Sequence, residues 1–222
     1  MATTDDAPTG SLRELKKART RAALIQVSQR LFAERGYHAT TLEEICAEVE
    51  VHPQTLLRHF ESKAHLALAP WREQFEVIRE VLACADRTTP AIDVWREVVR
   101  AEAIEAMEPS STVVGNMVTN HAAFTAWADK DPALVAMNSD LERRYESVLV
   151  HALAVDAGAG PDDLHCTLLA ALLVAGRRAV FDRWAVAGDR RSSLVDDQLA
   201  VIDYAVASLP REAAGRLPDV NM

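Results

Sequence analysis

The chain has 222 residues, of which 49% are hydrophobic and 26% are charged, so it is long enough and apolar enough to bury a sizeable core. Its formal net charge of −9 argues against a uniformly basic nucleic-acid-binding protein. Arg177 and Arg178 interrupt the longest apolar run, and the polar, acidic residues 1–10 lack the pattern of a signal peptide. We therefore expect a cytoplasmic protein that does not span a membrane.

The charge is unevenly distributed along the chain. Residues 11–65 contain nine Lys or Arg and seven Asp or Glu, whereas the chain after His65 contains 15 basic and 24 acidic residues. This asymmetry favours a mildly basic nucleic-acid-binding face on an acidic body.

The predicted elements are all helices. Apolar residues recur at helical spacing along the chain and strand-like alternation is absent, which predicts an all-α protein. The first helix is expected over residues 11–35, where Gly36 follows with the conformational freedom to end it. Five later helices are expected over residues 90–107, 111–127, 132–155, 162–187 and 192–208.

Local signals place three further helices between the first helix and residue 90. A second helix is expected after Thr41, because Thr41 and Glu44 have the spacing of a capping box. A third begins at Pro53, since proline is favoured at the first helical position. Ser62 can cap a fourth helix, which Pro70 should kink or restart.

The second and third helices are short, and only residues 50–52 separate them. This spacing favours a helix-turn-helix, whose second helix enters the major groove of DNA. An apolar stripe can close a small core with the first helix: Leu42, Ile45, Val49, Val51, Leu56 and Phe60. The side chains left facing outward can bind base edges or phosphates: Gln54, Thr55, Arg58 and His59. An ordinary helical hairpin with a polar solvent face fits the same pattern.

Residues 30–63 read RLFAERGYHATTLEEICAEVEVHPQTLLRHFESK. This stretch resembles the N-terminal region of the TetR family of regulators through Leu31-Phe32, Gly36-Tyr37, Thr40-Thr41, Ile45, Val51, Thr55-Leu56, Arg58-His59-Phe60 and Lys63. The match covers about the first quarter of the chain. It implies a three-helix helix-turn-helix DNA-binding domain over residues 11–62 and a helical ligand-binding and dimerisation domain over residues 63–209. Residues 1–10 are expected to be a disordered tail and residues 210–222 a second tail.

The resemblance also assigns residues to DNA. It implies that Thr41 caps the second helix near a phosphate. The positions that read bases in the family are occupied by Pro53, Gln54 and Thr55. The positions that contact bases or phosphates are occupied by Arg58, His59 and Lys63. A basic cluster leading into the first helix either adds phosphate contacts or is a solvated helix end: Arg13, Lys16, Lys17, Arg19 and Arg21.

Three residues depart from the family pattern. Glu50 stands where Gly is usual, and a positive φ there would cost about 1 kcal/mol. His52 replaces a capping Ser and can donate to phosphate when protonated. Leu57 replaces a Tyr whose hydroxyl often binds phosphate in the family. These departures predict weaker DNA binding rather than a different fold.

The last two predicted helices, within residues 162–209, are apolar on several sides. Together with the resemblance, this predicts a homodimer in which they form a four-helix bundle with their twofold copies, although a purely internal core is the alternative. Added charge at Leu199 or Ile202 is expected to dissociate the dimer, or to unfold the chain if those side chains are core.

The middle helices carry aromatic, methionine and a few polar side chains that suit an apolar ligand pocket or an ordinary core. The candidates for ligand contact are Trp95, Met117, His121, Phe124, Trp127 and Met137. Arg177 and Arg178 are expected either to pair with Asp182 or an acid on another helix, or to anchor an acidic ligand.

The resemblance implies a repressor that leaves a palindromic operator when an unidentified small molecule selects another conformation of the body. We find no catalytic motif, metal-ligand spacing or phosphate-binding loop, and so expect neither an enzyme nor a metal or other cofactor. Two alternatives remain: a helical small-molecule-binding protein whose DNA domain has decayed, as Glu50 and Leu57 suggest, and an enzyme on a helical bundle.

Overall fold

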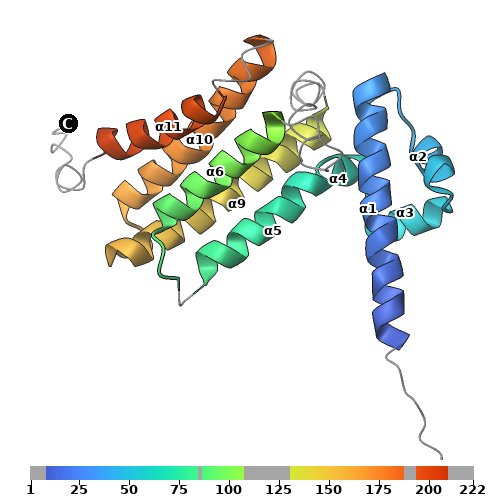
Figure 1. Cartoon of the computed structure of the whole chain (residues 1–222), viewed down its shortest axis with the longest axis horizontal. Helices are drawn as coiled ribbons and strands as arrows, with labels where there is room; N and C mark the ends of the chain where they lie inside the picture. The colour runs from blue at the N-terminus through green and yellow to red at the C-terminus, as the bar shows by residue number, and fades with distance from the viewer. Residues whose placement is uncertain (1–8, 85–86, 108–130, 188–193, 210–222) are drawn as a thin grey trace, which may run out of the picture. The chain divides into compact units, whose positions relative to one another are not determined.

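A computed structural model describes residues 9–84, 87–107, 131–187 and 194–209, and every element within these ranges is a helix (Figure 1). In chain order they are α1 Thr9–Arg35, α2 Leu42–Val49, α3 Pro53–His59, α4 Lys63–Ala67, α5 Ala69–Ala83, α6 Ala91–Met107, α9 Pro132–Ala157, α10 Leu164–Ala187 and α11 Leu194–Ser208. The all-α prediction is confirmed. The helix expected over residues 111–127 lies outside the described residues.

The chain divides into two compact units, Met1–Ala69 and Pro70–Met222. The first compact unit includes α4, which packs against α1. The buried side-chain amide of Gln29 in α1 donates a hydrogen bond of 2.9 Å to the carbonyl of Ala67 at the end of α4. Pro70 stands in the first turn of α5, where a missing N–H costs no helical hydrogen bond, so the expected restart of the helix is confirmed.

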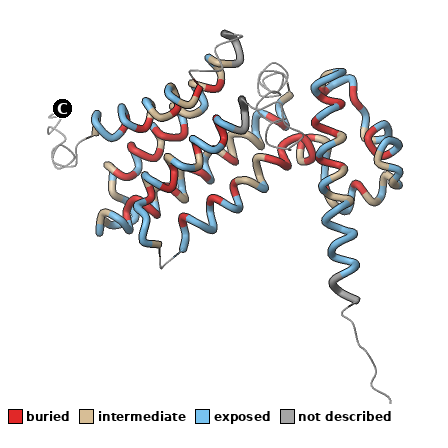
Figure 2. The backbone as a smooth tube through the Cα atoms, viewed as in Figure 1, coloured by how far each residue is buried: buried red, intermediate tan, exposed pale blue. Residues whose placement is uncertain are grey.

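In the N-terminal unit, the second half of α1 forms the core with α2, α3 and α4. Leu24, Leu31 and Phe32 of α1 are buried, as are Ile45, Leu56 and Phe60 of the predicted stripe (Figure 2). The first part of α1 is different, since residues 12–19 are all exposed. The unit thus combines a packed core of α1, α2, α3 and α4 with an exposed helical extension that carries most of the basic cluster.

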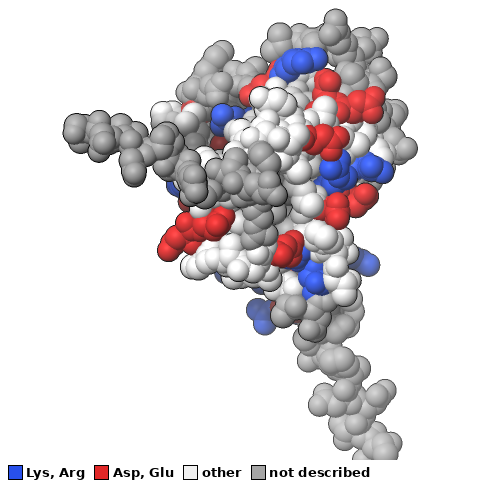
Figure 3. Space-filling model, turned by 90° about the vertical axis from the view of Figure 1, so that its left-hand side faces the viewer, with Lys and Arg blue, Asp and Glu red and all other residues white. Residues whose placement is uncertain are grey.

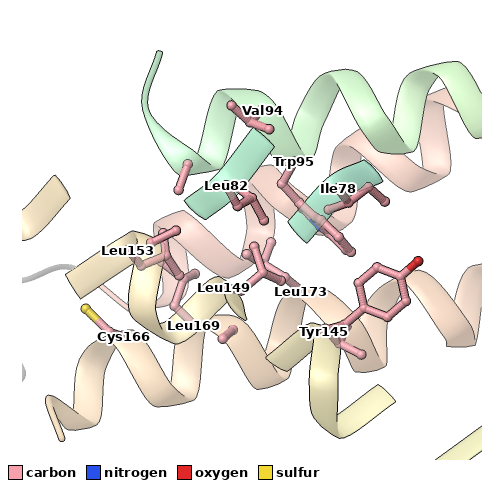
Figure 4. Packing of buried hydrophobic residues seen from close by; sticks show 14 of the residues in the cluster. Ile78, Leu82, Val94, Trp95, Tyr145, Leu149, Leu153, Cys166, Leu169 and Leu173 are labelled. Carbon is pink, nitrogen blue, oxygen red and sulfur yellow. The ribbon is translucent and has the colours of Figure 1, made fainter. Parts of the chain in front are cut away.

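The C-terminal unit has its core between α5, α6, α9, α10 and α11. Figure 4 shows the apolar centre of this core, where Trp95, Leu149, Leu153, Leu169 and Leu173 converge from α6, α9 and α10. Helix α10 packs against both α9 and α11. The contact with α11 is close enough that a Cβ at Gly176 would overlap the side chain of Val201, so glycine is required at this crossing.

Helix α10 contains a stretch, Leu164–Trp184, that is long and apolar enough to cross a membrane when only length and composition are considered. In the structure, however, α10 supplies the buried residues Leu169, Ala170, Leu173 and Val174 to the core. We therefore interpret it as the core helix of the C-terminal unit.

The end of α9 is attached to the start of α6 by Arg87 and Asp156. The guanidinium of Arg87 donates to both carboxylate oxygens of Asp156, at 2.6 and 3.2 Å, and the N–H of Ala91 donates to the same carboxylate. Burial alone would raise the pKa of Asp156, but the hydrogen bonds from Arg87 and Ala91 and the charge of Arg87 outweigh it, so this pKa is lowered.

Other ion pairs lie at the surface of the body, such as Arg79 with Glu76 and Arg96 with Asp203, each at 2.7 Å. On the face shown in Figure 3, acidic and basic side chains are interspersed among uncharged ones. Exposed pairs of this kind each contribute about 0–1 kcal/mol, so packing rather than charge holds the body together.

Candidate nucleic-acid interface and ligand site

The turn between α2 and α3 has the geometry of a helix-turn-helix, and α2 begins with the predicted capping box. The N–H of Glu44 donates to the hydroxyl of Thr41 at 3.2 Å, and the N–H of Thr41 donates to the carboxylate of Glu44 at 2.8 Å. The hydrogen bonds from Thr41 lower the pKa of Glu44. Thr41 itself is exposed, so its backbone and side chain remain at the surface expected to face phosphate.

Glu50 adopts the left-handed conformation that ends α2, with φ 58° and ψ 42°. It is the only non-glycine residue with positive φ among the residues described. Its N–H donates to the carbonyl of Ala47, and the N–H of Val51 donates to Cys46. Because φ is positive, the side chain at this position strains the backbone, as predicted from the sequence.

His52 caps α3, because its Nδ1 accepts a hydrogen bond of 3.3 Å from the N–H of Gln54. An accepting Nδ1 belongs to the neutral imidazole, whose proton is on Nε2. In this arrangement Nε2 is the His52 nitrogen that can still donate to a phosphate.

The faces of α3 agree in part with those predicted from the apolar stripe. Leu56 is buried, whereas Gln54 and Arg58 are exposed. Thr55 and His59 are half-buried, as is Pro53 in the first turn. Leu57 is 53% exposed, so the residue that replaces the family's tyrosine contributes little to the core.

Arg21 and Lys63 lie against aromatic rings of the same unit. The guanidinium of Arg21 is 4.5 Å from the centre of the Phe60 ring, and its Nη1 donates to the carbonyl of His59 at 3.2 Å. The Nζ of Lys63 is 4.3 Å from the centre of the Tyr37 ring. Both side chains thus have a packing role that the sequence pattern did not reveal.

The remaining basic candidates are placed differently. Lys17 and Arg19 are exposed on the first part of α1. Burial, followed by the charges of Arg21 and Lys17, lowers the pKa of His59, so the imidazole is neutral over a wider pH range than a free histidine. The positive charges around the end of α3 therefore come from arginine and lysine.

Comparison with known proteins agrees with the helix-turn-helix geometry of α2 and α3. The family model of bacterial regulatory proteins, tetR family, matches residues 24–69, which include α2, α3 and α4. The helix-turn-helix transcriptional regulator TcmR of Streptomyces glaucescens is 31% identical over 198 residues, covering 84% of this chain and 82% of TcmR. This chain belongs to the TetR family. It is a helix-turn-helix transcriptional regulator, as the resemblance implied.

Two further regulators resemble this chain, UidR over a shorter stretch and SmeT at lower sequence identity. The transcriptional regulator UidR of Escherichia coli K12 is 33% identical over 73 residues, covering 28% of this chain and 37% of UidR. SmeT, the repressor of the Stenotrophomonas maltophilia multidrug efflux pump SmeDEF, has the same fold, with a TM-score of 0.63 at 18% identity over 90% of this chain and 96% of SmeT. A SmeT–triclosan complex has a TM-score of 0.66 at 19% identity, covering 92% of this chain and 99% of SmeT.

Two of the six aromatic, methionine and histidine ligand candidates lie in the described part of the body. Trp95 is 1% exposed in the core, with its ring centre 5.9 Å from that of Tyr145, and Met137 is half-buried on α9. The other four lie outside the described residues: Met117, His121, Phe124 and Trp127.

Arg177 and Arg178 each pair with an acid on another helix, one of the two possibilities that the sequence left open. Arg177 Nε donates to Glu102 Oε2 at 2.7 Å, in a pair that is almost fully buried. Arg178 Nη1 donates to Glu142 Oε2 at 2.9 Å, with the arginine side chain more than half exposed. Because its charge is already compensated, Arg177 is a poor anchor for an acidic ligand.

Three buried polar residues around Arg177 were not predicted from the sequence: Glu102, Tyr145 and Gln198. One of them left a signal: Trp95, Val99 and Glu102 follow helical spacing, so an acid occupies a core position of α6. A buried acid needs a cation or a hydrogen-bond donor, so a polar partner is expected next to the inward face of α6.

The outer faces of α10 and α11 carry large exposed apolar side chains. Leu168 and Leu172 on α10 are 44% and 39% exposed, and Tyr204 on α11 is 71% exposed. Between the helices runs an open groove lined mainly by apolar residues, including Leu172, Ala175, Val180 and Val201. Ile202 is instead buried and Leu199 packs on the protomer core, so charge at these two positions is expected to unfold the chain rather than to dissociate a dimer.

Proposed function

We propose that this regulator is a homodimeric repressor that binds a palindromic operator and leaves it when a small molecule occupies the C-terminal unit. The observation that carries this proposal is the helix-turn-helix with an exposed α3 surface, within a chain that shares 31% identity with TcmR over most of its length. We further propose that it acts in the cytoplasm, where the DNA is, and without catalysing a reaction.

Base recognition is assigned to the exposed side of α3. Gln54 can make a bidentate contact with adenine, and Arg58 with guanine, while Thr55 can contact either base edge or a thymine methyl. Gln54 and Arg58 are exposed opposite the buried Leu56, and Thr55 is half-buried beside them. Pro53 and His59 border this surface.

Phosphate contacts are assigned to residues around α3. Thr41 and His52 stand at the starts of α2 and α3, where backbone N–H groups and the helix dipole favour an anion. Lys63 begins α4, and the exposed Lys17 and Arg19 can reach the backbone of the duplex from α1. Arg21 contributes chiefly by holding the end of α3 and adds positive charge there.

The dimer is assigned to the exposed apolar faces of α10 and α11. Monomeric proteins rarely leave an apolar surface of this kind in water. A twofold axis through this surface would bury Leu168, Leu172 and Tyr204 of both copies. The copy then supplies the second recognition helix, about 34 Å from the first on a palindromic site.

Release by a small molecule follows from linkage. A ligand that binds better to a body conformation with misplaced recognition helices shifts the population away from DNA. The fold shared with SmeT, a repressor of an efflux pump that has been crystallised with triclosan, supports an apolar small molecule as the ligand.

Fluorescence anisotropy of labelled duplexes tests the proposal. The protein should bind DNA from upstream of its own gene more tightly than a scrambled duplex at the same salt. Arg58→Ala should cost about 1–3 kcal/mol on the operator alone, whereas Lys63→Ala should weaken both duplexes and lower the salt slope by about one unit. Arg79→Ala, on the body, is the control. Equal binding of operator and scrambled DNA by the wild type would favour the alternative of a decayed DNA domain.

A further inference from the structure

The C-terminal unit buries several polar atoms without giving them hydrogen-bond partners. Among the described residues seven such side-chain atoms occur, and three belong to residues that contact Arg177: Glu102 Oε1, Tyr145 Oη and Gln198 Oε1. Glu102 forms the ion pair with Arg177, the guanidinium lies 5.7 Å from the Tyr145 ring centre, and Gln198 Nε2 donates to the Arg177 carbonyl at 3.2 Å. Three of the seven unpartnered atoms therefore belong to residues grouped around Arg177.

This concentration contrasts with the N-terminal unit, where buried polar side chains are satisfied. Gln29 donates to Ala67, Ser28 donates to Ile25, and Thr40 donates to Gly36. Leaving a buried polar group unpaired costs about 1–3 kcal/mol, and native proteins keep such groups where they have a use. Glu102, Tyr145 and Gln198 are 4%, 5% and 1% exposed, so bulk water does not satisfy them.

Aromatic rings border the same polar cluster. Tyr145 packs edge-on against Phe75 and Trp95, with ring centres 5.0 and 5.9 Å away, and Phe181 lies 5.3 Å from the Arg177 guanidinium. In Figure 4 the hydroxyl end of Tyr145 points away from the apolar side chains of Leu149 and Leu173. Apolar and aromatic walls with a few convergent polar atoms are the usual composition of a small-molecule site.

We propose that Glu102, Tyr145 and Gln198 form the polar end of the ligand site, and that the ligand is an uncharged, largely aromatic molecule whose hydroxyl group donates to Glu102. This inference rests on the proposed function, since it specifies the small molecule that the body binds. The hydroxyl oxygen accepts from Tyr145, and Gln198 Oε1 accepts from a second donor of the ligand.

The paired charges of Arg177 and Glu102 favour an uncharged ligand. Burial alone would lower the pKa of Arg177, but the charge of Glu102 outweighs it and raises this pKa, so Arg177 stays charged in this buried site. A carboxylate or ammonium group on the ligand would add an uncompensated charge to this buried site. A hydroxyl group satisfies the free oxygen of Glu102 without that cost.

Ligand-observed NMR titration of the full-length protein with three matched probes tests the inference. The probes are 2-naphthol, 2-methoxynaphthalene, which lacks the donor, and 2-naphthoate, which is anionic. The wild type should bind 2-naphthol about tenfold more tightly than either of the others, as one extra hydrogen bond allows. Equal affinities, a preference for 2-naphthoate, or no binding of any probe at millimolar concentration would overturn the proposal.

Two variants make the identical chemical change in different places. Tyr145→Phe should weaken the binding of 2-naphthol about tenfold, because the ring remains and only the hydroxyl that donates to the ligand oxygen is lost. Tyr37→Phe, in the N-terminal unit, should leave the affinity for 2-naphthol unchanged. If Tyr145→Phe leaves the affinity for 2-naphthol unchanged and only stabilises the fold, the unpartnered atoms are structural or hydrated and the assignment is wrong.

The outcome is separable from that of the DNA experiment. A protein that binds its operator but shows no preference for 2-naphthol retains the proposed function and loses only this inference. A protein with the expected preference that does not discriminate operator from scrambled DNA has the ligand site without the proposed function.

Discussion

The guanidinium of Arg21 in α1 lies 4.5 Å from the centre of the Phe60 ring at the end of α3. The same side chain donates to the carbonyl of His59, which is 38 residues away in sequence. One arginine thus holds the end of α3 against α1, which gives Arg21 a role in stability besides the DNA contact proposed for it.

Arg21→Ala should therefore lower the free energy of unfolding by about 1–2 kcal/mol, since a cation–π contact and a hydrogen bond are lost together. Urea denaturation followed by circular dichroism measures this loss. Arg19→Ala is the matched control, because Arg19 is exposed on the same helix. It should weaken DNA binding without changing stability. Equal stability of the two variants would contradict the packing role of Arg21.

Replacing Glu50 separates backbone strain from charge. Glu50→Ala removes the carboxylate but keeps a Cβ at φ 58°, whereas Glu50→Gly removes both. Because a side chain in this conformation costs about 1 kcal/mol, the glycine variant should be the more stable of the two, by somewhat less than that once the entropy of glycine is included. Thermal unfolding compares them, and an alanine variant at least as stable as the glycine variant would contradict the strain at this turn.

The effect of the Glu50 charge is measured separately, by DNA affinity. Both variants should bind operator and scrambled DNA more tightly than the wild type, because an acid next to the phosphate backbone is removed. Anisotropy titrations at two salt concentrations check this, and the gain should shrink at the higher salt. A gain in the glycine variant alone would assign the effect to the backbone.

Leu57→Tyr should tighten DNA binding without disturbing the fold. The side chain is 53% exposed, so a tyrosine needs no rearrangement of the core. Its hydroxyl can donate to a charged phosphate, a hydrogen bond worth about 1.5–3 kcal/mol, and phosphate contacts carry little sequence information. Affinity for scrambled DNA should rise along with affinity for operator. Leu57→Phe is the control that lacks the hydroxyl, and the same gain in both variants would show that no such bond forms.

Leu172→Glu should dissociate the proposed dimer and leave the protomer folded. Leu172 is 39% exposed on the outer face of α10, so the added charge is solvated in a monomer and buried in a dimer. Sedimentation velocity at micromolar concentration should show a dimer for the wild type and a monomer for this variant. Ile202→Glu, at a buried position of α11, should instead unfold the C-terminal unit. A monomeric wild type would disprove the proposed dimer.

The Arg87–Asp156 attachment predicts a pH dependence of stability. The folded-state pKa of Asp156 is lowered, so its contribution is fully present above the unfolded pKa of about 3.9 and is lost as the pH falls through the folded value. Asp156→Asn should therefore be less stable than the wild type at pH 7, and the difference should shrink below about pH 4. Asp162→Asn, at an exposed position, should match the wild type at pH 7. A difference that is the same at pH 7 and pH 3 would contradict the role of the carboxylate.

Much of the fold was determined by signals only a few residues apart. The capping box of Thr41 and Glu44, Gly36 after α1, and the prolines at 53 and 70 set where helices begin and end. These interactions span one helical turn, so the residues themselves decide them. The helix-turn-helix followed from the same local spacing, and the position of its apolar stripe also identified which side of α3 faces outward.

The tertiary structure alone decided which long-range partners those helices bring together. Arg177 and Glu102 are 75 residues apart, and nothing in either segment selects one acid from the 33 in the chain. Helix α10 is apolar on nearly every side, so its sequence did not distinguish the side that faces α9 from the one exposed at Leu172. For the same reason, the sequence did not predict the inward position of Ile202 or the contact between Arg21 and Phe60. Helical periodicity defines a face, but only packing against other helices determines what that face meets.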